Sequence, residues 1–281
     1  MIDYHQALAL DIPAVEHSYT AKDTMLYALG LGFGSDPVDP RQLRYVYEKG
    51  LEAFPTMAVV LGFISMRDIP LGIDYARMVH AEQSLQLHRP LPVAGSVLAR
   101  TRVAEIVDRG DKGALIYLER EVTDKLSGDR LATAGMSVLC RADGGFGGPT
   151  SSARVLDAVP DRVADHVHEI PTVPQQALIY RLSGDVNPLH VDPEAATKAG
   201  FERPILHGLA TFGLVARAIA AVALDGNAGR LRSLTGRFTS PVYPGETLRV
   251  ELWRGDSGWA VRAIALGRDK PVFTHGHATA G

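Results

Sequence analysis

A carboxylate, an amide and an imidazole lie close together in this chain, at Asp185, Asn187 and His190. A positioned acid or imidazole can take a proton from water and hand a proton on to a reacting atom. Gly184 and Pro188 stand among the three residues, and both types interrupt regular elements. The stretch therefore predicts acid–base chemistry in a loop or a broken helix.

A second chemical position follows at His207 and Gly208, directly before a helical pattern. Apolar residues recur at three- and four-residue steps from Leu209 to Ala223, which predicts a helix with a broad buried face. The first N–H groups of a helix lack partners inside it and lie at the positive end of its dipole. An acid–base group beside such a terminus could move protons next to a carbonyl that is being polarised.

Each of these residues also has a structural interpretation. Asp185 before Asn-Pro fits a turn that its own side chain caps, and a single histidine such as His190 is more often structural than catalytic. His207 fits a buried polar residue that holds the loop as well as it fits a functional one. Asp192-Pro193 fits the N-cap and first residue of a short helix, so we interpret it as structural.

The chain repeats itself weakly. The segment 90–98 resembles the segment 240–248, and in both a Pro/Gly turn leads into alternating residues, which is typical of a strand. Two copies of one unit are therefore expected, each with one long helix, which in the first copy is predicted from Pro55 through Gly62. Strands are predicted at 95–106, 113–123, 130–141, 246–254, 258–267 and 271–279.

Between the copies, residues 142–160 are rich in Gly, Ser and Pro, which is typical of a linker. We predict a first unit over 1–148, a linker over 149–164 and a second unit over 165–281. A chain of 281 residues is long enough for either one large or two small domains.

Composition narrows the class of protein. Hydrophobic content of 46% and charged content of 22% are ordinary for a globular enzyme, and a net charge of −3 predicts neither nucleic-acid nor membrane binding. The single Cys140 excludes an intrachain disulfide. The first residues lack a secretory pattern, and the last four are not a peroxisomal address. A cytoplasmic protein is the simplest expectation.

Three other patterns are too incomplete to predict a site. The glycines of 30–34 lack the full dinucleotide fingerprint. The pairs His166/His168 and His275/His277 have no clear third ligand, so no metal is expected. No Gly-x-Ser-x-Gly elbow supports a serine hydrolase.

The stretch Tyr180–Asp185, continued by Asn187–His190 and Asp192-Pro193, resembles the hydratase signature of the MaoC-like, (R)-specific enoyl-CoA hydratases. Pro204–Leu209 matches the same family. Further matches cover most of the chain and resemble two-repeat members, such as the hydratase part of peroxisomal multifunctional enzyme type two: 45–48, 54–56, 80–83, 90–92, 144–148, 237–238 and 241–245. The resemblance implies an α+β double hot-dog fold, in which each repeat wraps a curved antiparallel sheet around a central helix.

The resemblance also implies roles for single residues. Asp185 and His190 would contact the one water that is split across the double bond in a syn addition. Asn187 would orient that water, and the backbone N–H of Gly208 would donate to the thioester oxygen. Substrate or CoA contacts are expected at His80, Ala81, Arg109, Val186, Pro188, Leu189, Arg237 and Phe238, with the two arginines meeting phosphates. Arg109 also fits a solvated turn residue.

In the first repeat, residues 27–39 echo the signature but have no histidine at the matching place. We infer that this copy has lost the chemistry, and we expect it to cover the site and shape an acyl pocket. Glu48 matches a family glutamate, which we interpret as structural support.

The predicted function is therefore reversible hydration of trans-2-enoyl-CoA to (3R)-3-hydroxyacyl-CoA. No cofactor is expected, because CoA is part of the substrate, and a homodimer is plausible from family habit. The same residues would serve a 3-hydroxyacyl dehydratase acting on carrier-protein or other CoA thioesters in fatty-acid or polyketide synthesis. A thioesterase of this fold lacks the Asp-x-Asn-x-x-His string, and a non-catalytic acyl-CoA-binding module would not need it.

Overall fold

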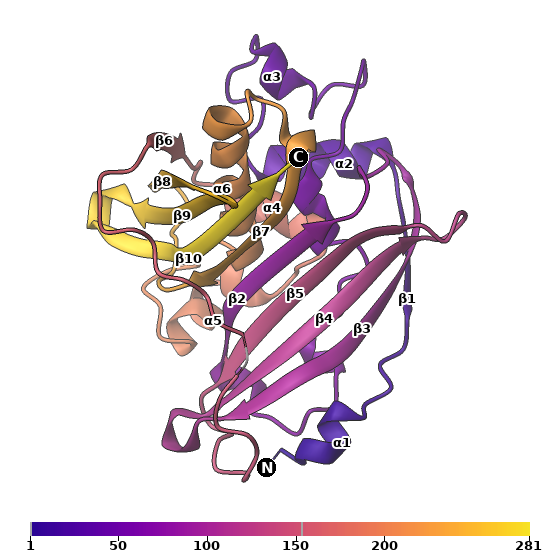
Figure 1. Ribbon diagram of the computed structural model, residues 1–281, viewed down its shortest axis with the longest axis vertical. Coiled ribbons are helices and arrows are strands. Elements are labelled where there is room, and N and C mark those ends of the chain that lie inside the picture. The colour runs from indigo at the N-terminus through magenta and orange to yellow at the C-terminus, as the bar shows by residue number, and fades with distance from the viewer. Residues whose placement is uncertain (1, 153) are drawn as a thin grey trace.

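In the computed structural model, which describes residues 2–152 and 154–281, the strands form one ten-stranded antiparallel sheet. The order is β1-β3-β4-β5-β2-β7-β10-β9-β8-β6, so the first five strands occupy one half and the last five the other (Figure 1). If β6 to β10 are matched with β1 to β5, the order reads the same from both edges. This pseudo-twofold arrangement confirms the prediction of two copies of one unit.

Six of the ten strands were predicted, and their observed bounds differ from the prediction by a few residues. They are β3 (Gly95–Asp108), β4 (Ala114–Asp124), β5 (Arg130–Cys140), β8 (Thr247–Gly255), β9 (Gly258–Ala265) and β10 (Lys270–Ala280). Four strands were not predicted: β1 (Val15–Tyr19), β2 (Met78–Leu87), β6 (His166–Pro171) and β7 (Leu231–Phe238). β2 and β7 join the two halves of the sheet. The sequence of β2 does not show a clear strand pattern, because a bulge at Ala81 interrupts the alternation of its side chains.

The long helix α6 (Gly208–Ala223) confirms the helix predicted for the second repeat. It packs against β6, β7 and β8 of its own repeat and against β2 of the other. From Leu209 to Ala216 every residue is buried, as expected for a helix gripped by a curved sheet. The positive φ of Asp225, 56°, turns the chain away just after the helix ends.

The prediction of a long helix in the first repeat is wrong. Only a five-residue 3₁₀ helix, η1 (Pro55–Val59), forms there. Gly62 has a φ of 61°, and a Cβ at this position would collide with the Cβ of Ala99 on β3. The close approach and the left-handed backbone stop any helix from continuing, so the concave face of the first half-sheet is covered by an irregular segment.

The remaining α-helices are short: α1 (Tyr4–Leu8), α2 (Ala21–Gly30), α3 (Pro40–Leu43), α4 (Gln176–Tyr180) and α5 (Pro193–Lys198). α2 of the first repeat packs against α4 of the second. The rings of Tyr27 and Tyr180 lie 5.7 Å apart, and a Cβ at Gly30 would lie 3.1 Å from the Cα of Tyr180. The two matching segments therefore lie directly against each other. No helix among the described residues is long and apolar enough to cross a bilayer.

The described residues between β5 and β6 carry no helix or strand. The start of this segment is nevertheless held down, because the carboxylate of Asp108 accepts N–H groups of Gly145 and Gly147, each at 2.7 Å. These bonds and a third from Gly110 lower the pKa of Asp108. The boundaries of the linker stay a prediction.

Candidate active site

The acid–base stretch is a helix broken twice. α4 ends at Tyr180, and Gly184 has a φ of 125° that other residues rarely adopt. Next, the side chain of Asp185 accepts the N–H of Asn187 at 3.2 Å, and the side chain of Asn187 accepts that of Leu189 at 3.1 Å. The predicted broken helix is confirmed, and so is the predicted turn formed by Asp185. Asp192 caps α5 as expected, with Pro193 as its first residue.

Asp185 and His190 face each other across a short gap. The Nε2 atom of His190 lies 3.9 Å from a carboxylate oxygen of Asp185, too far for a hydrogen bond. The Nδ1 atom of His190 lies 2.8 Å from the carbonyl oxygen of Ile205. Because a carbonyl can only accept, Nδ1 carries the proton, and Nε2 of the neutral ring presents a lone pair. Two proton acceptors therefore face one space that a water could enter.

His207 holds this arrangement from behind. It is fully buried, and its Nε2 lies 3.0 Å from the backbone carbonyl of Asp185, to which it donates. Its ring stacks on that of His190 with a centroid distance of 3.7 Å and an interplanar angle of 25°. Of the two interpretations open from the sequence, these contacts favour a residue that holds the loop.

Burial keeps the histidines of the site neutral. Desolvation lowers the pKa of His190, although the Asp185 carboxylate partly opposes this shift. Desolvation lowers the pKa of His207 to about 3, with His190 as a second cause. It also lowers the pKa of His80 to about 4. Near pH 7 the site therefore contains uncharged imidazoles beside one carboxylate.

Gly208 is the first residue of α6, as predicted, so its N–H lies where a helix leaves its donors unpaired. A Cβ at this position would lie 3.5 Å from Nδ1 of His80 and 3.4 Å from the Phe238 ring. The rings of His80 and Phe238 are themselves 4.9 Å apart. The bulge at Ala81 shifts the register of β2 between His80 and Glu82. The structure thus brings three predicted positions together in front of the N-terminus of α6.

The other predicted contact residues lie farther out. Val186, Asn187 and Pro188 are exposed and Leu189 is half-buried, so they form a surface beside the Asp185–His190 pair. Arg237 is bound by Glu82, with N–O distances of 3.0 and 2.7 Å, and its side chain keeps 43% exposure.

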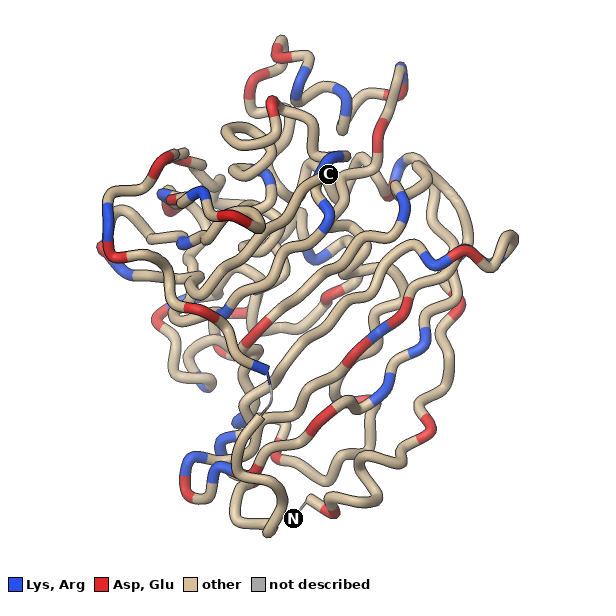
Figure 2. The backbone as a smooth tube through the Cα atoms, in the orientation of Figure 1, with Lys and Arg blue, Asp and Glu red and all other residues tan. Residues whose placement is uncertain are grey.

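Arg109 is exposed at the turn between β3 and β4. This turn lies at the end of the sheet where β2 begins, because Met78 and Ala114 both pair with Cys140. His80 and Arg109 therefore lie toward the same end of the half-sheet. Figure 2 shows further cations close to this turn.

Asp185, His190 and His207 also offer three ligand atoms within 4.8 Å of one another, a set that the sequence analysis did not consider for a metal. The lone pairs of an imidazole lie in the plane of its ring. Since the two rings are stacked nearly parallel, their lone pairs do not converge on one point. The arrangement fits acid–base chemistry better than tetrahedral ligation.

A cavity that the sequence did not indicate lies next to Leu209, the second residue of α6. It lies in the first repeat and is lined by Val59, Phe63, Ile64, Ile69, Gln83, Thr101, Leu118, Arg120, Ala134, Gly135, Met136 and Leu209. Alternation along β4 could have indicated two of these residues, because Leu118 and Arg120 share the inward face with Val122. An acyl pocket in the first repeat stays a prediction from the sequence.

Two family models match the chain. The model described as "MaoC like domain" matches residues 155–268, and the "MFE-2 hydratase 2 N-terminal domain" matches residues 17–142. The two matches fall on the two halves of the sheet.

Relatives match over nearly the whole length. The chain is 40% identical to "Enoyl-CoA hydratase ChsH3" of Mycobacterium tuberculosis, covering 98% of this chain and 97% of that protein. It is 36% identical to the peroxisomal "Enoyl-CoA hydratase 2" of Arabidopsis thaliana, covering 88% of this chain and 85% of that protein.

Among solved structures, a MaoC-like dehydratase from Phytophthora capsici superposes with a TM-score of 0.87 at 30% identity, covering 99% of this chain and 98% of that one. A Mycobacterium tuberculosis protein described as having a double hotdog fold superposes with a TM-score of 0.61 at 16% identity, covering 99% of this chain and 97% of that one. The second likeness concerns the fold alone, and it agrees with the two-unit sheet.

Proposed function

The chain belongs to the MaoC-like family of hydro-lyases, in the two-repeat form with a double hot-dog fold, and we propose that it is an (R)-specific enoyl-CoA hydratase. The reaction is the reversible syn hydration of a trans-2-enoyl-CoA to a (3R)-3-hydroxyacyl-CoA. One observation carries the proposal: the free Nε2 of His190 and the Asp185 carboxylate face the same space, 3.9 Å apart, beside the start of α6.

The protonation states set the path of the proton. A water in this space can donate one O–H to His190 and the other to Asp185. As its oxygen adds to C3, one of the two acceptors takes a proton. Neither group holds a proton on the facing side at the start, so the proton delivered to C2 is the one removed from water. Both parts of one water then add from one side, which gives syn addition.

The developing negative charge needs a donor. The N–H of Gly208 supports this role, because it lies at the positive end of the dipole of α6. Absence of a side chain at Gly208 leaves room for the thioester between His80 and Phe238. Asn187 would steady the turn that aims Asp185, and Arg109 and Arg237 would meet CoA phosphates.

The test is absorbance near the enoyl-thioester band while the protein meets crotonyl-CoA and then trans-2-decenoyl-CoA, with chiral analysis of the product. We expect the band to disappear and a (3R)-hydroxy product to form. Release of free thiol would indicate a thioesterase instead. Tight binding without turnover would indicate a binding module.

A carrier-protein substrate is the remaining alternative, because the same residues would act on either thioester. Comparison of CoA and acyl-carrier-protein thioesters of one chain length decides between them, and faster turnover on the carrier protein would contradict the proposal. A cytoplasmic location, a homodimer and a place in fatty-acid metabolism stay predictions from the sequence.

A further inference from the structure

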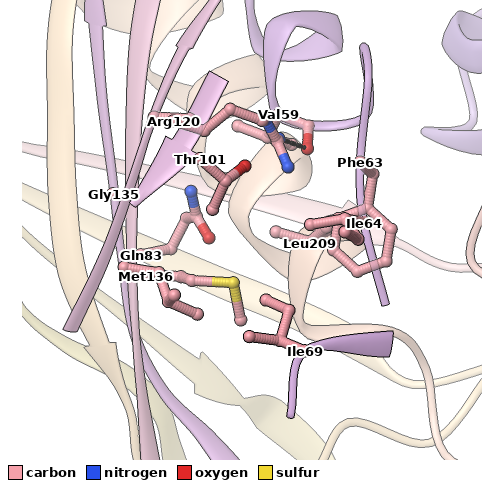
Figure 3. A pocket seen from close by; sticks show the side chains of 12 residues that line it. Val59, Phe63, Ile64, Ile69, Gln83, Thr101, Arg120, Gly135, Met136 and Leu209 are labelled. Atoms are coloured by element: carbon pink, nitrogen blue, oxygen red, sulfur yellow. Dashed lines mark hydrogen bonds between the residues drawn. The ribbon is translucent and has the colours of Figure 1, made fainter. Parts of the chain in front are cut away.

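The cavity of the first repeat lies next to the start of α6. Leu209, which lines the cavity, directly follows Gly208 at the start of α6. The other walls are the end of η1, the segment after it and residues of β2 to β5 (Figure 3). A thioester held at Gly208 would therefore lie one residue away from a wall of this cavity. The cavity volume of about 20 Å³ already admits a group the size of a water, and the long side chain of Met136 can yield to a larger one.

The far wall of the cavity is not apolar. Arg120 extends from β4 into it beside Thr101 and Gln83, as Figure 3 shows. Arg120 is 7% exposed, and Gln83 is 3% exposed. A wall built only for a hydrocarbon tail would not need a guanidinium, because removing a charge from water is strongly unfavourable unless the charge is paired.

Arg120 has few partners inside the protein. Its Nη2 donates to the backbone carbonyl of Val59, and its guanidinium lies 5.7 Å from the centre of the Phe63 ring. Its Nε is buried without a hydrogen-bond partner, and no ion pair within residues 2–152 and 154–281 includes it. Desolvation lowers the pKa of Arg120 to about 10, so the side chain is still a cation at neutral pH. A buried cation with an unused donor needs an anionic acceptor from outside the chain.

We propose that the cavity takes the distal end of the acyl chain, and that this end bears a carboxylate that pairs with Arg120. The preferred substrate would then be the CoA monothioester of an ω-carboxylated trans-2-enoic acid. This inference rests on the proposed function. Thr101 and Gln83 would supply further hydrogen bonds to the carboxylate.

The experiment compares matched substrates that differ only at the distal end. Enoyl-CoA thioesters of eight, ten and twelve carbons are prepared with an ω-methyl, an ω-hydroxyl or an ω-carboxyl group, and kcat/KM is measured for each. At the best-fitting length, the wild-type protein should prefer the carboxylate over the methyl group by at least about 10-fold, since the buried charge is left unpaired by the latter. Preference for the methyl group at every length would overturn the inference, and an equal gain with the hydroxyl would assign the cavity to a neutral end.

Variants then test whether Arg120 is responsible for the preference. Arg120→Leu should abolish the preference for the carboxylate and raise kcat/KM on the methyl substrate, whereas Arg120→Lys should keep part of the preference. Arg102→Leu is the matched control, because Arg102 lies on the neighbouring strand β3 but is exposed and paired with Glu119 at 2.7 Å. It should leave the preference unchanged.

Crotonyl-CoA distinguishes a failure of this inference from a failure of the proposed function, because its four-carbon chain carries no distal group that could pair with Arg120. If the wild-type protein hydrates crotonyl-CoA but does not prefer the carboxylate, this inference alone fails. If it hydrates no thioester, the proposed function fails. If Arg120→Leu loses crotonyl-CoA hydration as well, the role of Arg120 is only to hold the carbonyl of Val59. If that variant does not fold, the comparison of carboxyl and methyl substrates with the wild-type protein still decides the inference.

Discussion

The two halves of the molecule start from the same plan and differ in what fills it. Both contain five strands in matching order, and both end the matching segment with an N-cap aspartate and a proline that begin a short helix, Asp39 for α3 and Asp192 for α5. Counted back from these caps, Gly32 stands at the position of Asp185 and Pro37 at that of His190. The capped helix is thus a property of the fold, whereas the chemistry comes from the aspartate and the imidazole placed before it in the second repeat.

The concave faces of the two half-sheets also differ in what covers them. In the second half the sixteen residues of α6 fill the space, while in the first half five residues of η1 and the segment after it leave a cavity. A close-packed interior has few voids larger than a water, so a shortened element is a direct way to obtain volume. One copy therefore keeps the catalytic helix terminus, and the other supplies room beside it.

The largest expected effect tests the difference between these two segments. Asp185→Ala and His190→Ala should each lower kcat on crotonyl-CoA by at least about 100-fold, because each removes a partner in proton transfer. Asp36→Ala, the control in the first repeat, should leave kcat within about 2-fold of the wild-type value. Steady-state kinetics and a circular dichroism spectrum check both points, and near-wild-type activity of Asp185→Ala would refute the assignment of the site.

Substitutions of two glycines of α6, Gly208 and Gly213, should distinguish an effect on catalysis from an effect on packing. Gly208→Ala should reduce kcat/KM by about 10-fold to 100-fold, because the methyl group enters the space between His80 and Phe238 where the thioester would bind. The free energy of unfolding should not fall, since the contacts of 3.4 and 3.5 Å are ordinary.

Gly213→Ala should behave in the opposite way. Its methyl group would lie 2.5 Å from the side chain of Leu31 in the first repeat, so we expect a loss of about 1–3 kcal/mol in the free energy of unfolding. Turnover per folded molecule should change little. Urea denaturation and kinetics on both variants check the contrast, which disappears if both lose activity and stability together.

The desolvated histidines of the site should make stability depend on pH. Their folded-state pKa values lie below the value of about 6.5 expected in the unfolded chain, at about 4 for His80 and about 3 for His207. The stabilisation is fully present above pH 6.5 and is lost as the pH falls toward these values. Each histidine contributes a slope of about 1.4 kcal/mol per pH unit within that window.

Denaturation series between pH 7.5 and 5 measure this slope. His80→Gln should reduce the slope of the free energy of unfolding against pH by the contribution of one histidine. His88→Gln removes an exposed histidine just after the same strand and should leave the slope unchanged. A free energy of unfolding that is flat across this range would contradict the neutral state assigned to the site.

The smallest effect on kcat is expected from substitution of Asn187. Asn187 caps a single 3₁₀ turn by accepting the N–H of Leu189, and its replacement leaves both proton acceptors in place. Asn187→Ala should therefore lower kcat by less than about 10-fold. Kinetics on crotonyl-CoA, with Val38→Ala in the corresponding segment of the first repeat as a control, measure the difference. A loss as large as that of Asp185→Ala would make the amide an equal partner in the chemistry.

Local features of the sequence were sufficient for much of the site. Gly184 and Pro188 predicted the broken helix, because each restricts the backbone around itself. Apolar spacing predicted α6 and placed Gly208 at its start. Alternation after a turn predicted six strands but not β2 and β7, where a bulge and several polar side chains mask the period.

The sequence by itself determined that the chain has two copies of one unit and that the second carries Asp185, Asn187 and His190 on a turn before a helix. Only the tertiary structure decided the proton positions, since the carbonyls of Ile205 and Asp185 fix which nitrogen of His190 and His207 holds hydrogen. It also decided that η1 stops early and that Arg120 lies within a cavity. These features depend on contacts between residues far apart in the chain, and local spacing carries no information about such contacts.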